Sequence, residues 1–214
     1  MVRLLILRHG VSLTNKDKRY TGKMDVPLAP LGYEQAEVAC RFIAENYRVD
    51  AVYASDLSRA ANTVRPLAER LSLPLSLRRE LREIDLGDWE GKTYEEVKVL
   101  YPETWERLHK ERHLVRYEGG ESFGEAYERA KRAFLSIARE NEGKTAVVAS
   151  HGGTIRLFLA FVLGLPFEKS SDAPLIPNAS LSLVEIEGES MRLRFAGEDG
   201  YLKELTLEVD GNLH

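Results

Sequence analysis

Two histidines, His9 and His151, each follow a short apolar run and directly precede a glycine. The two runs, residues 2–7 and 145–149, have the length and composition of strands that are buried on both faces. In open parallel sheets, ligands bind outside the carboxyl ends of the strands, which is where both histidines fall. The glycine after each histidine lets the backbone approach a ligand closely. We therefore expect one binding site built from these two strand ends.

Arginines accompany the two histidines. Arg8 directly precedes His9, and Arg59 falls near the start of a helix predicted to follow a strand at residues 51–54. A guanidinium group matches two oxygens of a phosphate, so these four side chains predict a site for a doubly charged oxyanion, with phosphate as the main candidate. A metal site is the alternative, but neither histidine belongs to a His-x-His or His-x-x-x-His pair. We expect neither a metal ion nor another cofactor.

The composition excludes several classes of protein. With 214 residues, 43% of them hydrophobic, the chain can bury a core without disulfide or metal support. Its single cysteine, Cys40, excludes a disulfide framework and a cysteine-based zinc cluster. A formal charge of −4 argues against a nucleic-acid or anionic-membrane surface. The longest apolar run, residues 157–165, is shorter than the roughly 20 residues of a membrane span, and the N-terminus lacks a signal peptide's apolar stretch. We expect a cytoplasmic protein.

The remaining pattern predicts the elements that position these residues. Short apolar runs indicate strands, and apolar residues at helical spacing indicate helices. The expected strands are 2–7, 51–54, 74–77 and 145–149, and the expected helices are 31–47, 121–141 and 154–163, with a further helix after residue 55. Pro66 should kink or restart that further helix.

Together these elements predict the fold class. Residues 180–186 and 191–195 alternate between apolar and polar around Gly188, which is typical of an antiparallel hairpin. We expect an α/β, three-layer fold, in which a mostly parallel sheet has helices on both faces and a C-terminal antiparallel hairpin. Residues 1–214 should form a single domain, with a helical insertion at about 92–118 that breaks at Pro102.

Several short blocks of the chain, spanning residues 3 to about 165, resemble the histidine phosphatase superfamily, also called the phosphoglycerate mutase-like family. The blocks occur in the family's order, which makes the resemblance specific. They are 7–10 (Leu-Arg-His-Gly), Asn15, 20–22 (Tyr-Thr-Gly), 28–36, 55–60 (Ser-Asp-Leu-Ser-Arg-Ala), 81–91, 119–122 (Gly-Gly-Glu-Ser) and 148–153 (Val-Ala-Ser-His-Gly-Gly).

The resemblance implies a role for each matched residue. His9 would be the nucleophile that forms a phosphohistidine intermediate, and Glu83 would be the general acid and base. Arg8, Arg59 and His151 would stabilise the charge on the phosphoryl oxygens. The rest of the phosphate-binding set would be Asn15, Thr21, Gly22 and Gly152. His109, His113 and His214 lack such a context, and we interpret them as structural or surface residues.

Three departures from the mutase pattern favour a phosphatase. Mutases carry Glu-Arg-His-Tyr-Gly around the acid, whereas residues 83–87 read Glu-Ile-Asp-Leu-Gly. The proline-rich insertion of the mutases is missing, because Pro102 is the only proline in residues 92–118. Residues 151–153 read His-Gly-Gly and not His-Gly-Asn. We therefore predict a metal-independent phosphatase of the α-ribazole-phosphate, phosphoserine or broad-specificity type. A cofactor-dependent phosphoglycerate mutase and a non-catalytic phospho-ligand binding module are the alternatives.

The partner implied is a small-molecule phosphomonoester, and its identity is open. Two segments, residues 16–24 and 93–117, should form the specificity wall. Their basic residues either meet a carboxylate or second phosphate of the substrate or form a solvated rim: Lys16, Lys18, Arg19, Arg112, His113 and Arg116. Met24 and Trp105 either contact the substrate or pack in the core. The oligomeric state is open too, with a homodimer through the edge of the hairpin as one option.

Overall fold

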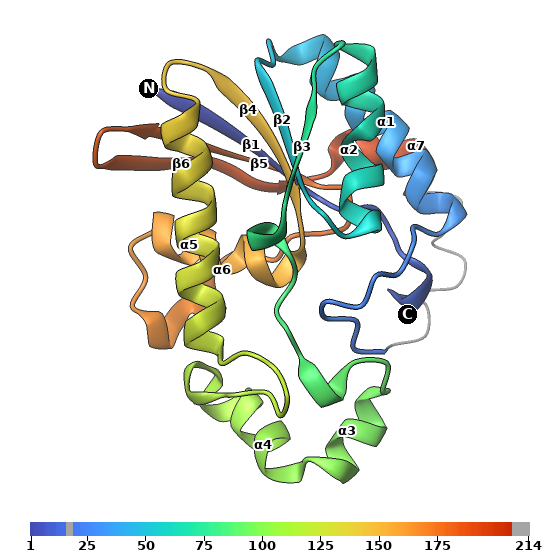
Figure 1. Ribbon diagram of the computed structural model, residues 1–214, viewed down its shortest axis with the longest axis vertical. Coiled ribbons are helices and arrows are strands. Elements are labelled where there is room, and N and C mark those ends of the chain that lie inside the picture. Colours follow the sequence, from blue (N-terminus) through green and yellow to red (C-terminus); the bar gives the residue numbers. More distant parts are fainter. Residues whose placement is uncertain (16–18, 207–214) are drawn as a thin grey trace.

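A six-stranded sheet forms the centre of the computed structural model, which describes residues 1–15 and 19–206. The strand order is β3-β2-β4-β1-β5-β6, and the first four of these are mutually parallel. The last two form an antiparallel hairpin beside β1 (Figure 1). The strands are β1 (Val2–Arg8), β2 (Ala51–Ser55), β3 (Leu75–Arg78), β4 (Thr145–Ser150), β5 (Leu181–Glu187) and β6 (Ser190–Glu198). The predicted mostly parallel sheet with a C-terminal hairpin is confirmed.

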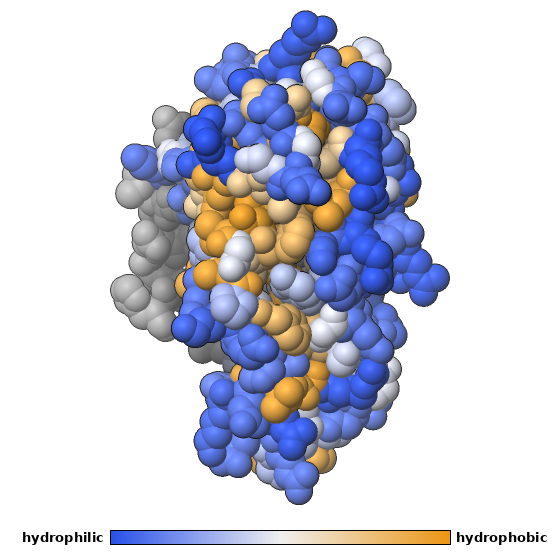
Figure 2. All heavy atoms as spheres, turned by 90° about the vertical axis from the view of Figure 1, so that its left-hand side faces the viewer, coloured by the Kyte–Doolittle hydropathy of each residue, from blue (hydrophilic) through white to orange (hydrophobic). Residues whose placement is uncertain are grey.

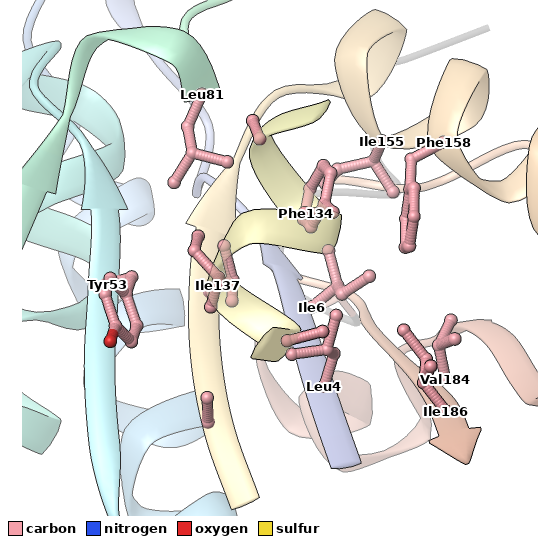
Figure 3. Packing of buried hydrophobic residues seen from close by; sticks show 14 of the residues in the cluster. Leu4, Ile6, Tyr53, Leu81, Phe134, Ile137, Ile155, Phe158, Val184 and Ile186 are labelled. Atoms are coloured by element: carbon pink, nitrogen blue, oxygen red, sulfur yellow. The ribbon is translucent and has the colours of Figure 1, made fainter. Parts of the chain in front are cut away.

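Helices cover both faces of this sheet, as predicted. One face carries α1 (Pro30–Asn46) and α2 (Ser58–Arg70), and the other carries α5 (Phe123–Glu140) and α6 (Gly152–Val162) (Figure 1). The side chains of β1 alternate between the two cores, because successive residues of a strand point to opposite faces. Leu4 and Ile6 pack with α5 and α6 (Figure 3), whereas Leu5 and Leu7 pack with α1 and α2.

The predicted helical insertion lies beyond the carboxyl ends of the parallel strands (Figure 1). It contains α3 (Tyr94–Leu100) and α4 (Pro102–Lys110), with the break before Pro102 as expected. Trp89 is fully buried at its base, and its indole Nε1 donates a hydrogen bond of 3.0 Å to the Glu118 carboxylate. The remaining short elements are η1 (Leu13–Asn15), η2 (Arg79–Leu81), η3 (Gly87–Trp89), η4 (Arg112–Leu114), η5 (Phe167–Asp172), η6 (Gly200–Leu202) and α7 (Lys203–Thr206).

One local prediction is wrong in part, because α2 continues through Pro66 and does not restart there. A proline inside a helix removes the hydrogen bond that its own nitrogen would donate to the carbonyl four residues earlier. Val64 and Leu67, on either side of Pro66, are fully buried and pack in the same core cluster. The burial of these neighbours offsets the lost hydrogen bond and keeps the helix in one piece.

An apolar surface lies beside the hairpin. Figure 2 shows apolar side chains gathered in the upper half of the face that carries α5 and the hairpin. A groove on this side of the molecule is lined in part by Met1, Leu135, Phe161 and Met191. β6 is an edge strand of the sheet. Among the described residues, no helix has both the length and the apolar character needed to cross a membrane.

The stacked pair Phe134 and Phe158 joins α5 to α6 and allows a test of the core. The two rings are fully buried, with centroids 4.4 Å apart (Figure 3). We expect Phe134→Ala to lower the free energy of unfolding by about 3–5 kcal/mol, because it leaves a cavity under α6. Urea unfolding followed by circular dichroism measures the change. Val99→Ala, at a side chain that is 78% exposed, should change it by less than about 0.5 kcal/mol. Equal effects of the two substitutions would contradict this picture of the core.

Candidate active site

The register between β1 and β4 brings the two predicted histidines together. Arg8 lies opposite Ser150, and the backbone amide of His9 donates a 3.0 Å hydrogen bond to the Ser150 carbonyl. His9 and His151, which follow these strands, therefore sit side by side with ring centroids 5.1 Å apart. Both are buried, with 5% and 0% of their surface exposed. The predicted meeting of the two strand ends is confirmed.

Hydrogen bonds fix the orientation of the His9 ring. Its Nδ1 lies 2.7 Å from the carbonyl oxygen of Gly10, which can only accept a hydrogen bond. Nδ1 therefore carries the ring proton, and in the neutral ring Nε2 keeps its lone pair free. The backbone carbonyl of His9 is itself held by the Ala179 amide at 3.1 Å and the Asn178 side-chain amide at 3.0 Å. The ring is thus presented as a neutral base or nucleophile with Nε2 as its reactive atom.

Two arginines flank the histidines, of which Arg59 is buried and Arg8 half-buried. Arg59 is 1% exposed, and its two terminal nitrogens donate 2.7 Å hydrogen bonds to the carbonyls of Met24 and Gly22. Arg8 donates to the carbonyl of Ile176. Both guanidinium groups are held by backbone oxygens, which fix their position without neutralising their charge.

Several nitrogens at this site point at no protein acceptor. In the described part of the chain, four buried side-chain nitrogens have no hydrogen-bond partner: Nε of Arg8, Nε of Arg59 and both ring nitrogens of His151. A buried polar group without a partner costs roughly 1–3 kcal/mol, so a cluster of them calls for an explanation. An anionic ligand with several oxygens would accept hydrogen bonds from the two arginine nitrogens and from the His151 ring nitrogen that carries the proton.

Glu83 lies at the start of α6, beside the same cluster. Its carboxylate oxygens accept hydrogen bonds from the backbone amides of Gly153, at 3.1 Å, and Thr154, at 3.0 Å. The Thr154 hydroxyl lies 3.3 Å from the same carboxylate. A helix N-terminus offers unpaired amides and a positive dipole end, so it holds an anionic side chain well. The predicted acid is therefore fixed at the rim of the site.

Burial and charge act together on the titration of the site. Burial, followed by the charges of Arg8 and Arg59, holds the pKa of His9 well below its usual 6.5. Burial and the charge of Arg59 act in the same way on the pKa of His151. Burial also lowers the pKa of both arginines, and the charge of Glu83 opposes that shift. Both imidazoles are therefore neutral at neutral pH, while the arginines stay cationic.

A cavity of about 230 Å³ opens in front of these groups. Arg8, His9, Arg59 and Glu83 line it together with Thr21 and Gly22. Four of the seven predicted phosphate-binding residues, Arg8, Thr21, Gly22 and Arg59, therefore line one cavity, whereas His151 and Gly152 are not among its lining residues. A group of three or more histidine, cysteine, aspartate or glutamate side chains that could hold a metal ion does not occur in the described ranges.

The other predicted residues have varied positions. Gly152 is the first residue of α6, where a Cβ atom would lie 3.2 Å from the Arg8 guanidinium carbon. Asn15 ends η1, but its side chain lies outside the described part of the structure, as do Lys16, Lys18 and His214. Cys40 is buried and donates to the Thr63 carbonyl, as expected of a packed core thiol.

The specificity wall is only partly as predicted. Arg112 and Trp105 line a second cavity next to the first, so neither belongs wholly to the solvated rim or to the core. His109, interpreted from sequence as structural or surface, lines it too. Arg116 is exposed and pairs with Glu125 at 2.7 Å, as a rim residue would. The sequence pattern did not indicate Asn178 and Ala179 as residues of the site, although they directly precede β5 and so lie next to the end of β1.

Known proteins resemble this chain over most of its length. The family model described as histidine phosphatase superfamily (branch 1) matches residues 4–199. Phosphoserine phosphatase 1 of Hydrogenobacter thermophilus is 33% identical over 187 residues, which are 87% of this chain and 88% of that protein. The solved structure of Bacillus stearothermophilus YhfR has a TM-score of 0.89 at 28% identity, covering 94% of this chain and 100% of its own. The α-ribazole phosphatase of Shigella flexneri has a TM-score of 0.83 at 26% identity, covering 92% and 96%.

The lowered pKa values of the two histidines predict a pH dependence of stability. Below about pH 6.5 His9 and His151 bind protons in the unfolded chain but stay neutral in the folded site. The free energy of unfolding therefore falls as the pH falls. Each histidine contributes a slope of up to about 1.4 kcal/mol per pH unit. We expect His9→Asn and His151→Asn each to reduce this slope between pH 6.5 and 5, measured by urea unfolding.

Comparing each variant with the wild-type chain cancels the contribution of the carboxylates. His113→Asn, outside both cavities, serves as the matched control and should leave the low-pH slope closer to that of the wild-type chain. Identical slopes for all four proteins would show that the two active-site imidazoles are not held neutral.

Proposed function

The chain is a member of the histidine phosphatase superfamily, and on that premise we propose that it hydrolyses a small phosphomonoester through a phosphohistidine on His9. Similarity to phosphatases supports phosphomonoester hydrolysis as the general activity. The observation that carries the detailed proposal is the set of unpartnered, buried nitrogens of Arg8, Arg59 and His151 around the free Nε2 of His9. A phosphoryl group has the oxygens to accept hydrogen bonds from the two arginines and from the ring nitrogen of His151 that carries the proton.

In the first step, Nε2 of His9 attacks the phosphorus atom and the bond from phosphorus to the ester oxygen breaks. The lone pair is available because Nδ1 donates its proton to the Gly10 carbonyl. Glu83 enters this step protonated and gives its proton to the departing alkoxide, which leaves as an alcohol. Arg8, Arg59 and His151 stabilise the charge on the phosphoryl oxygens. The two arginines need little reorganisation, because backbone carbonyls already hold them.

In the second step, a water molecule attacks the phosphohistidine. Glu83 takes a proton from that water, the bond between phosphorus and nitrogen breaks, and His9 returns to its neutral form. Inorganic phosphate is released. Asn15, Thr21, Gly22 and Gly152 complete the phosphate-binding set of this proposal. Since every bond change uses side chains of the chain itself, the proposed reaction is metal-independent.

The side chains beside Glu83 favour hydrolysis over a mutase reaction. Ile84 and Leu86 both line the cavity that holds His9, and both are apolar. In the mutase pattern these positions are arginine and tyrosine, which help to hold phosphoglycerate. An apolar wall offers no such contact, so a phosphorylated second substrate would be held less firmly and water would be the acceptor. We further propose that residues 1–214 act as a single cytoplasmic domain.

Phosphate release from p-nitrophenyl phosphate and phosphoserine, with EDTA present, tests this proposal. We expect turnover that resists EDTA and that falls at least about a thousandfold in His9→Ala, because the nucleophile is lost. Mass spectrometry of alkali-quenched protein should find phosphate on His9 during turnover. His113→Ala, a histidine outside both cavities, is the matched control and should keep its activity.

Three outcomes would contradict the proposal. Activity that survives in His9→Ala would exclude the phosphohistidine route. Activity lost with EDTA and restored by a divalent ion would exclude metal independence. Isomerisation of 3-phosphoglycerate in the presence of 2,3-bisphosphoglycerate, without phosphate release, would identify a mutase instead.

A further inference from the structure

A second cavity of about 390 Å³ adjoins the cavity that holds His9. Four residues line both: Tyr20, Ile84, Tyr94 and Gly153. The larger cavity therefore begins where the phosphate-binding cavity ends, on the side of the helical insertion. A phosphomonoester whose phosphorus faces His9 would extend its leaving group into this space.

The walls of this second cavity are largely aromatic. Trp105 comes from α4, Tyr117 from the segment after η4, and Phe123 from the start of α5. Tyr20 and Tyr94 complete the lining at the mouth shared with the first cavity. Such a wall suits a flat or apolar body, because aromatic side chains offer large contact areas with few rotatable bonds.

The same cavity contains two guanidinium groups and no acidic side chain among its lining residues. Arg112 lies 6.0 Å from the centre of the Phe123 ring. Arg156, on α6, is half-buried and donates to the carbonyls of Ser171, at 2.7 Å, and Ala173, at 3.0 Å. The two arginines line the same cavity, and burial together with the charge of Arg112 lowers the pKa of Arg156. In the described part of the chain, neither is paired with a carboxylate.

Two neighbouring cations without a counter-charge favour an anion between them. We propose that this cavity binds a leaving group that carries a second anionic group, a carboxylate or a phosphate, next to an aromatic or apolar body. This substrate class rests on the proposed phosphatase function of the adjoining site. Arg112 is the specificity-determining residue, since Arg156 is already engaged by backbone carbonyls.

Matched aryl phosphates test the proposal directly. The set is 3-carboxyphenyl, 3-phosphonophenyl and 3-carbamoylphenyl phosphate, in which the amide is the neutral counterpart of the carboxylate. We expect kcat/KM to be about tenfold to a hundredfold higher for the best anionic ester than for the amide, as for a hydrogen bond to a charged group. The preferred anion distinguishes a carboxylate from a phosphate. Arg112→Gln should bring the ratio close to one, and Arg107→Gln, exposed on α4, should preserve it.

Each possible failure has a different meaning. A wild-type ratio near one, or a ratio unchanged in Arg112→Gln, would overturn the anion site while leaving the phosphatase intact. No turnover of any ester would overturn the proposed function instead. Calorimetry with the His9→Ala variant and the same esters then measures the anion preference through binding alone, so the second cavity is tested in either case.

A separate observation concerns the segment that carries Glu83. Arg129, on α5, donates to the backbone carbonyls of Glu80 at 2.9 Å, Arg82 at 2.8 Å and Glu83 at 3.4 Å. Glu121 accepts from the Arg129 Nε at 3.1 Å and from the Asp85 amide at 2.9 Å. The two side chains therefore hold the backbone on both sides of Glu83. Arg129 binds carbonyls up to and including that of Glu83, and Glu121 binds the amide of Asp85.

Burial makes this arrangement rigid. The side chains of Arg129 and Glu121 are only 21% and 16% exposed, and they form a salt bridge with each other. An arginine can make these contacts at once because its planar group carries five donors, whereas lysine has a single ammonium. We infer that Arg129 and Glu121 are positioning residues that set where the Glu83 carboxyl lies. This inference also rests on the proposed acid role of Glu83.

The leaving group supplies a readout that a general loss of structure would not move. Benzyl phosphate needs a proton on its departing oxygen, whereas p-nitrophenyl phosphate departs readily without one. Glu83→Gln should therefore lower kcat/KM for benzyl phosphate about a hundredfold more than for p-nitrophenyl phosphate. Arg129→Lys should show the same bias, at about tenfold, and should add no further bias in the Glu83→Gln background. Arg132→Lys, one turn further along α5, is the matched control.

The outcomes separate the two claims. Equal losses for both esters in Arg129→Lys would mean that the arginine is merely structural. No bias in Glu83→Gln would remove the acid role from Glu83 itself. A bias in both single variants that adds up in the double variant would show that Arg129 acts independently of Glu83.

Discussion

The parallel pairing of β1 with β4 is the constraint on which the site depends. Because Arg8 lies opposite Ser150, β1 and β4 end at the same level of the sheet, and the residues that follow them are the adjacent histidines. A shift of one residue in this register would turn Arg8 and the core residues of β1 to the opposite face. The same shift would also move Arg3, which is exposed and pairs with Glu185, to the face where Val2 and Leu4 are buried, so the packing of β1 helps to fix the geometry of the site.

The site contains buried polar nitrogens without hydrogen-bond partners, which a folded core normally avoids. These side-chain nitrogens belong to Arg8, Arg59 and His151, and their burial without partners lowers the free energy of unfolding. The fold tolerates this because backbone carbonyls take the remaining donors of Arg8 and Arg59. Such carbonyls hold a guanidinium group in place but leave its charge uncompensated. The stability given up here keeps the donors aimed at the position of a phosphoryl group.

What the sequence could predict follows from the range of the interactions. The strands, the hairpin and the break at Pro102 depend on neighbouring residues, and these predictions are confirmed, with strand ends shifted by one to three residues. The contacts of Arg129 depend on residues far away in the chain, and no local pattern marks an arginine that binds three distant carbonyls. Trp105 and Arg112 were ambiguous for the same reason, because only the packing of the insertion decides whether a side chain faces a cavity. Pro66 shows the opposite case, in which tertiary packing overrides a strong local signal.

The second glycine after His151 links the chemistry to the choice of reaction. A Cβ atom at Gly153 would lie 2.7 Å from a Glu83 carboxylate oxygen and 3.0 Å from the side chain of Ile84. A larger residue there, such as the asparagine of the mutase pattern, would have to displace one or both. The glycine at 153 and the isoleucine at 84 are therefore in contact and not independent departures from that pattern. Together they let Glu83 approach the start of α6 closely while an apolar side chain closes the cavity beside it. Two of the three departures from the mutase pattern thus form one packed unit next to the proposed acid.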